Sequence, residues 1–200
     1  MPSWLESFVL TFVPLFIVID ALGNVPIVMS LSEGMSSHER RKLINDATIT
    51  ATLVGLAFLF FGQLILNVMG ISVGSFAIAG GLILLVLSIN YMTTGRMVEV
   101  MKEEMVAVVP IGTPLTVGPA TITTLLLLTT QFPLYTVLLS FVLNLLIVWG
   151  TLRLGNKIVR FMGRGGLKAV SRVFSLLLAA IAVTMITKGL NLLGVLSVGI

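Results

Sequence analysis

One carboxylate lies deep inside the first apolar stretch of the chain, residues 5–31, beside three residues that disturb a membrane helix; the other acid of the stretch, Glu6, lies at its beginning. The group is Asp20, Gly23, Asn24 and Pro26. An ionisable side chain costs at least about 2.5 kcal/mol at the centre of a membrane helix, and a proline removes a backbone hydrogen bond that lipid does not replace. We therefore expect these four residues to form part of a substrate-binding or ion-binding site rather than plain scaffold.

The fourth apolar stretch, residues 105–129, contains a second cluster of helix-breaking residues. Its candidate site residues are Thr113, Pro114, Thr116, Gly118 and Pro119. Two prolines and a glycine this close together are hard to accommodate in one continuous helix, and the threonines add hydroxyl groups. We expect this helix to be interrupted as well. The structural alternatives are a proline kink without a site and threonines that bond back to their own turn.

An interrupted membrane helix exposes backbone groups that bind ions. The N–H groups and the dipole at the start of the second half favour an anion such as a substrate carboxylate, and the carbonyls at the end of the first half favour cations. Asp20 is suited to a substrate ammonium, a sodium ion or a proton. The two interruptions together suit a small zwitterion, with H⁺ or Na⁺ as the coupling ion and no other cofactor.

The composition indicates an integral membrane protein. Of 200 residues, 57% are hydrophobic and 10% are charged, whereas a soluble domain has about 25% charged residues. The chain has no cysteine, and its one histidine, His38, lies in a charged segment. A disulfide framework is therefore excluded, and a zinc or haem enzyme is disfavoured. The phosphate-binding pattern G-x-x-x-x-G-K-[ST] does not occur, so ATP is not the expected energy source. We predict neither an enzyme nor a nucleic-acid partner.

Six apolar stretches predict six transmembrane helices. Six helices fill one compact bundle in the lipid bilayer. They lie at 5–31, 43–68, 71–93, 105–129, 134–152 and 173–196. The charged connections at 32–42, 94–104 and 153–172 hold 11 of the 12 lysines and arginines. Positive charge marks cytoplasmic loops. We predict a multi-pass protein of the cell membrane with both termini outside, and no cleavable signal peptide.

The second half of the chain repeats the first at a shift of 93 residues. The matched pairs include Pro26 with Pro119, Gly62 with Gly155, Met69 with Met162, and Gly70 with Gly163. Three helices in each half give the halves opposite topologies, which is a pattern of secondary transporters. The predicted fold is an all-α membrane protein in which one transmembrane domain, 1–200, consists of inverted repeats 1–93 and 94–200. Helices one and four are interrupted near the midplane.

With these residues identified, the chain resembles the MarC family, which includes an archaeal transporter of small neutral amino acids. The motifs that carry the resemblance are DALGNVP from Asp20 to Pro26, the pair Gly80-Gly81, and PLTVGP from Pro114 to Pro119. The resemblance covers essentially the whole length. Ala21 departs from the family pattern, which usually has proline there. The resemblance implies a six-span inverted-repeat transporter of glycine, alanine or similar amino acids with a coupling ion.

Three function classes compete on the residues alone. The first is an ion-coupled transporter of small polar or zwitterionic solutes. The second is a cation channel or exchanger in which Asp20 is the ion site. It requires no second, anion-binding interruption, so the cluster at 113–119 favours the first class. The third, an intramembrane enzyme, would have to take its nucleophile and base from Asp20, threonines and one loop histidine, which is a poor catalytic constellation.

Overall fold

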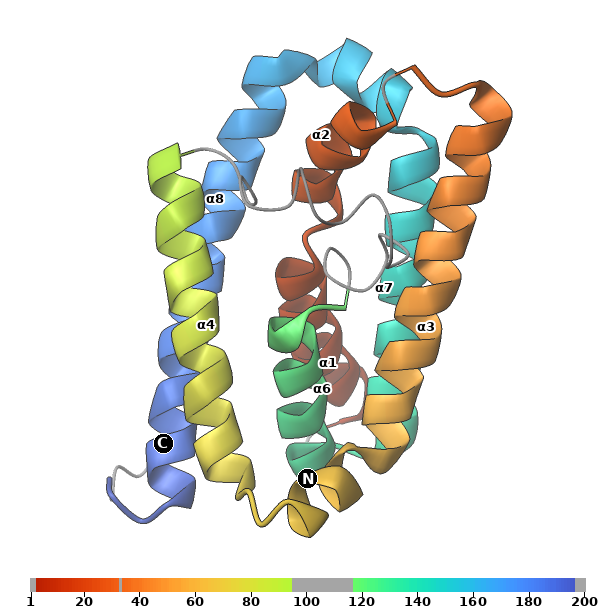
Figure 1. The fold of residues 1–200 in the computed structure, drawn as a ribbon. Helices are drawn as coiled ribbons and strands as arrows, with labels where there is room; N and C mark the ends of the chain where they lie inside the picture. Colours follow the sequence, from red (N-terminus) through yellow and green to blue (C-terminus); the bar gives the residue numbers. More distant parts are fainter. Residues whose placement is uncertain (1–2, 33, 95–116, 197–200) are drawn as a thin grey trace.

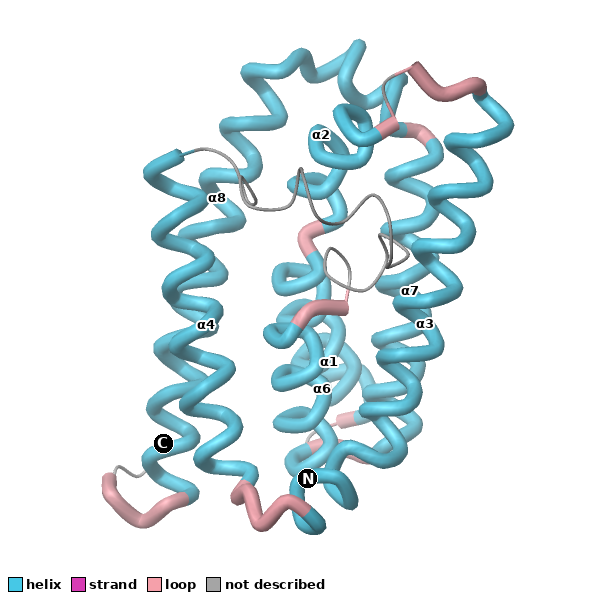
Figure 2. Tube along the Cα trace, viewed as in Figure 1, coloured by secondary structure: helices cyan, strands magenta, loops and turns pink. Residues whose placement is uncertain are grey.

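The computed structural model describes residues 3–32, 34–94 and 117–196, and these ranges are helical apart from short turns (Figures 1 and 2). No strand occurs within them, which confirms the predicted all-helical class. The helices are α1 (Trp4–Ile19), α2 (Ala21–Leu31), α3 (Ser37–Val68), α4 (Val73–Thr94), α6 (Pro119–Gln131), α7 (Leu134–Arg153) and α8 (Gly155–Leu192).

Five segments of these helices are long and apolar enough to cross a membrane. They are Trp4–Pro26, Ser37–Val68, Val73–Asn90, Leu134–Arg153 and Gly165–Leu192. The fourth predicted stretch is represented by a shorter apolar helix, Ala120–Gln131. The beginning of α1 and the end of α8 lie at the lower end of the view in Figure 1, whereas the basic ends of α3, α7 and α8 lie at the upper end.

Two connections that were predicted as loops are largely helical. α3 begins at Ser37 because the Ser36 side chain and Glu39 form a capping box, with the Glu39 N–H 3.3 Å from Ser36 Oγ. The predicted loop 153–172 is wrong for a different reason. Its apolar residues Ile158 and Leu167 pack against the core while Lys157, Arg160 and Arg172 are exposed, so the segment forms an amphipathic helix.

The helices bury two separate apolar cores. The first joins α1 and α2 to α3, α7 and the beginning of α8, and its largest fully buried side chain is Phe141. The second joins α4 and α8 to α6, with Val18 as the contribution of α1. α1 and α6 therefore lie between the α4–α8 pair and the α3–α7 pair, which Figure 1 shows as the two flanks of the bundle.

Glycines let α4 and α8 pack closely. A Cβ atom added to Gly189 would lie 2.6 Å from the Gly74 carbonyl oxygen, and one added to Gly81 would lie 2.8 Å from the Ala182 carbonyl oxygen. Small residues allow this approach of two helix backbones, which is the usual way that membrane helices associate. Gly80 faces the other way, towards the Thr123 side chain of α6.

Two glycines with left-handed backbone stand at matching positions of the predicted repeat. Gly70 (φ +68°) follows α3, and Gly163 (φ +67°) makes the kink inside α8. They are 93 residues apart, which is the shift of the repeat. Each ends one helical segment and allows the next to turn back, because glycine carries no Cβ penalty in this conformation.

Candidate functional site

The first membrane helix is interrupted at one residue, Asp20. Its φ and ψ of 43° and 63° are left-handed, and it is the only non-glycine residue of the described ranges with positive φ. Aspartate tolerates this conformation better than most side chains. The Asp20 N–H still donates to the Phe16 carbonyl at 3.2 Å, so α1 ends in a satisfied turn before the chain changes direction. The interruption is the pink segment between α1 and α2 in Figure 2.

Asp20 also caps the helix that follows. Its Oδ1 accepts a hydrogen bond from the Gly23 N–H at 3.0 Å, and its carbonyl accepts one from the Asn24 N–H at 3.1 Å. The Asn24 side chain reaches back and donates to the Ile19 carbonyl at 2.9 Å. The aspartate's own carboxylate therefore occupies the positive end of α2.

Gly23 makes the space in which this carboxylate lies. A Cβ atom at position 23 would overlap Asp20 Oδ2 and would lie 2.6 Å from Asp20 Cγ. Since Gly23 lies inside α2 and has no positive φ, the requirement for glycine here is one of space and not of backbone conformation. Glycine and aspartate in the motif therefore act as one unit.

One oxygen of this carboxylate remains available. Asp20 is 1% exposed, and its Oδ2 has no hydrogen-bond partner among the residues that the structure describes. A buried charged oxygen without a partner is costly. A bound ammonium group, a metal cation such as Na⁺, or a proton would each remove this cost. The geometry at Asp20 is therefore suited to a cation.

Pro26 does not cause the interruption. It lies inside α2, six residues beyond Asp20, and it is exposed. α2 continues through it to Leu31, because the proline deprives only the Leu22 carbonyl of its intrahelical donor. Within the predicted cluster from Asp20 to Pro26, the break therefore lies at Asp20, and Pro26 is part of the helix that follows.

Part of the second predicted interruption lies outside the described residues. Thr113, Pro114 and Thr116 belong to that part. The structure does describe the start of α6 at Pro119, with Gly118 as an N-cap that brings no side-chain hydrogen bond. Of the threonines within α6, Thr124 bonds back to its own turn, at 2.8 Å from the Ala120 carbonyl.

The N-terminus of α6 lies near the Asp20 interruption. Val117 belongs to the same buried cluster as Ala21 and Val25, and Ala120 belongs to the same cluster as Val18. α6 also packs against α1, so these shared clusters bring the positive end of α6 to the region where α1 gives way to α2. The N-terminus without a side-chain cap and the buried carboxylate therefore lie in the same part of the bundle.

A row of buried polar residues between α1 and α7 was not predicted. Thr11 Oγ1 lies 2.7 Å from Ser140 Oγ, and Asn144 Nδ2 donates to the Phe12 carbonyl at 3.2 Å. These bonds tie the two helices together, so Asn144 has a structural role between α1 and α7. The spacing of Thr136, Ser140 and Asn144, four residues apart, is the signal that one face of α7 is polar.

Metal ligation by a cluster of side chains is not indicated. Within the described ranges no three histidine, cysteine, aspartate or glutamate side chains gather at a position suited to a metal ion.

The comparisons with known proteins agree with this membrane architecture. The family model of the MarC family integral membrane proteins matches residues 5–193. A UPF0056 membrane protein of Archaeoglobus fulgidus is 34% identical over 200 residues, which cover 94% of each chain. The UPF0056 inner membrane protein YhgN of Escherichia coli K12 is 31% identical over 185 residues, 89% of this chain and 93% of that protein. No solved structure matches the chain.

The match spans nearly the whole chain, and it includes both the Asp20 interruption and the start of α6. The resemblance to the MarC family drawn from the three motifs is thereby confirmed. The chain belongs to the MarC family of integral membrane proteins.

Proposed function

We propose that this protein is a secondary active transporter of small neutral amino acids, such as glycine and alanine, driven by a proton or sodium gradient. The observation that carries the proposal is Asp20, a buried carboxylate at a helix interruption whose Oδ2 has no partner among the described residues. Such a group is suited to bind the substrate ammonium or the coupling ion of a transporter. The proposal includes no enzymatic step and no cofactor besides the coupling ion.

The substrate carboxylate requires a second, positive group, and α6 is suited to supply it. Its N-terminus has no side-chain cap, and its contacts bring it near the interruption at Asp20. N–H groups at a helix start favour an anion. In this proposal Thr113, Pro114, Thr116, Gly118 and Pro119 form the carboxylate side of the site. Asp20, Gly23 and Asn24 form the cation side, and Pro26 stays in the proposed set only as part of α2.

We also propose that the chain is an inverted repeat of two three-helix halves. Three observations support it. Gly70 and Gly163 have the same left-handed backbone at equivalent positions. Gly62 packs against α6, and its equivalent Gly155 packs against α2. The contacts of α4 with α6 are mirrored by those of α8 with α2. Such repeats meet at a site near the midplane, where their interrupted helices lie together.

The proposed orientation puts both termini outside the cell and the basic segments in the cytoplasm. It is supported by the division of lysine and arginine, 11 on one side and 1 on the other. The E. coli relative is named an inner membrane protein, and we propose the cell membrane as the location here.

Transport into proteoliposomes tests the proposal. Purified protein is reconstituted, and uptake of radiolabelled glycine and alanine is measured with a proton gradient or a sodium gradient imposed separately. We expect one gradient to drive accumulation above the external concentration. Ion flux through the protein without any amino acid movement would support the cation channel or exchanger instead. Absence of both fluxes in correctly folded protein would contradict a transport function.

A further inference from the structure

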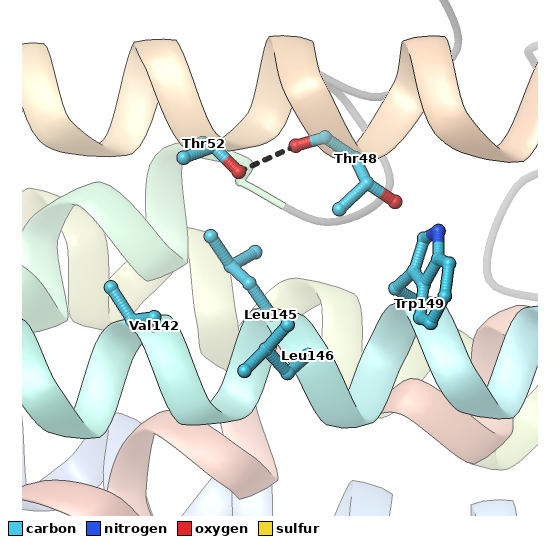
Figure 3. Close-up of a pocket in the computed structure, with 6 residues that line it drawn as sticks. All are labelled: Thr48, Thr52, Val142, Leu145, Leu146 and Trp149. Carbon is cyan, nitrogen blue, oxygen red and sulfur yellow. Dashed lines mark hydrogen bonds between the residues drawn. The ribbon is translucent and has the colours of Figure 1, made fainter.

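A groove on the outside of the bundle lies between α3 and α7, away from the Asp20 site. Its volume is about 320 Å³. The residues that line it are Thr48 and Thr52 of α3, and Val142, Leu145, Leu146 and Trp149 of α7 (Figure 3). Both threonine hydroxyls donate to their own helix, Thr48 to the Ile44 carbonyl at 2.8 Å and Thr52 to the Thr48 carbonyl at 2.7 Å. The threonines therefore bring satisfied hydroxyls, and the groove is apolar.

The groove opens on a face that the membrane surrounds. Its neighbours Ile49 and Leu53 on α3 are 57% and 64% exposed, and Leu146 at its edge is 56% exposed. Apolar side chains exposed to this extent on a membrane-spanning helix contact hydrocarbon. The occupant of such a groove is an acyl chain unless another helix covers it.

A basic and aromatic cluster closes one end of the groove. The Trp149 Nε1–H donates to Asn45 Oδ1 at 2.9 Å, which holds the indole in place. The guanidinium of Arg153 lies 4.4 Å from the Trp149 ring centroid and 3.5 Å from Asn45 Oδ1. Among the described residues Arg153 has this amide as its only hydrogen-bond acceptor and forms no ion pair. Its remaining N–H donors are available to an anion.

The charge around this cluster is positive. Arg41 and Lys42, one turn before Asn45 on α3, are exposed, and Arg153 ends α7. The acids of these helices are Glu39, whose carboxylate accepts from the Ser36 N–H in the capping box, and Asp46, which follows Asn45; both are exposed. Tryptophan and arginine at a helix end are typical of the depth at which lipid headgroups lie. An arginine donates to a phosphate with two parallel hydrogen bonds.

We propose that this groove binds one anionic phospholipid, with an acyl chain along Thr48, Thr52 and Leu146 and the phosphate on Arg153. The charge favours this occupant over a zwitterionic lipid, whose phosphate carries its own cation. It also favours lipid over a second copy of the chain, because a second copy would bring the same basic cluster to the contact.

Native mass spectrometry on the purified protein tests the site, with phosphatidylglycerol and phosphatidylcholine of identical chains as the probes. We expect the wild type to retain phosphatidylglycerol more strongly than phosphatidylcholine. Arg153→Gln should weaken the binding of phosphatidylglycerol about tenfold, the size expected when a hydrogen bond to a charged group is lost. It should leave the binding of phosphatidylcholine unchanged. Arg172→Gln removes another exposed arginine, on α8, and is the matched control. It should change neither lipid.

A second variant tests the groove itself. Leu146→Trp fills the groove and should weaken the binding of both lipids. Because Leu146 is exposed, the substitution should leave the core intact. Equal losses in Arg153→Gln and Arg172→Gln would mean general electrostatic attraction and would overturn the site. Unchanged lipid retention in Leu146→Trp, with a change in oligomeric state, would assign the groove to a second copy and would also overturn the proposal.

Discussion

Replacing Gly23 by alanine perturbs the position of the Asp20 carboxylate without changing any charge. The added Cβ would overlap Asp20 Oδ2 and would lie 2.6 Å from Cγ and 3.0 Å from Oδ1. Because the overlap is with the carboxylate itself, on a short side chain, the carboxylate must turn away from α2. The hydrogen bond from the Gly23 N–H to Oδ1, at 3.0 Å, is lost.

The expected effects on stability and on transport differ in size. Loss of a helix N-cap costs about 1 kcal/mol, and alanine in place of glycine inside a helix gains about 1 kcal/mol. The free energy of unfolding should therefore change by less than about 1 kcal/mol. A hydrogen bond to a charged group contributes about 1.5–3 kcal/mol. If the displaced carboxylate no longer meets its cation, affinity should fall between about tenfold and about a hundredfold.

Two assays separate these effects. Thermal unfolding in detergent should give the variant and the wild type similar midpoints, and uptake into proteoliposomes should show a raised half-saturation concentration. Gly150→Ala is the control, because a Cβ at Gly150 in α7 meets nothing within 4 Å. It should leave uptake unchanged. Normal uptake by Gly23→Ala would refute the idea that the position of the Asp20 carboxylate determines binding.

The remaining predictions concern orientation and packing. The chain has no cysteine, so single cysteines can report orientation. Ser37→Cys at the start of α3 should be shielded from an impermeant thiol reagent in intact cells, whereas Asn67→Cys at the other end of α3 should be labelled. The reverse labelling pattern would invert the proposed orientation. Ser37 is a better probe than Ser36, which caps α3. Gly189→Leu should destabilise the protein by about 1–3 kcal/mol or more through overpacking, since α8 contacts the α4 backbone there. The measurement is the thermal unfolding midpoint, compared with that of Gly150→Leu as the control. Equal midpoints for the two variants would contradict close packing of α4 on α8.

Apolar length and helix-breaking residues were enough to predict an all-helical membrane protein and an interruption in the first helix. The motif from Asp20 to Pro26 also predicted the family correctly. These features depend on composition and local backbone preference. They are visible in one sequence because a membrane helix has few other ways to tolerate a buried acid.

The residue that makes the interruption was predicted less well. Proline is the strongest helix breaker by propensity, so Pro26 was taken as part of the break. In the structure Asp20 adopts the left-handed conformation. Its N–H ends α1 by donating to the Phe16 carbonyl, and its carboxylate caps α2 by accepting from the Gly23 N–H. These two hydrogen bonds stabilise the left-handed backbone. A residue that ends one helix and caps the next is not recognisable from propensities, because the signal requires both helices to be placed.

The basic segment after Arg153 shows a similar limit. Its five lysines and arginines, together with Arg153 before them, predicted a loop, whereas it forms the first part of α8. Its amphipathic pattern, with Ile158 and Leu167 directed to the core, separates a charged surface helix from a charged loop. Contacts between helices distant in sequence, such as Thr11 with Ser140, were beyond pattern analysis for the same reason.

The central claim is that Asp20 binds the cation on which transport depends. Asp20→Asn keeps the size of the side chain and removes its charge, and Asp46→Asn is the control because Asp46 is exposed near the start of α3. The decisive measurement is gradient-driven accumulation of radiolabelled glycine and alanine in proteoliposomes that contain each variant. The account predicts loss of accumulation in Asp20→Asn, with folding retained, and normal accumulation in Asp46→Asn. Wild-type accumulation by Asp20→Asn would contradict it.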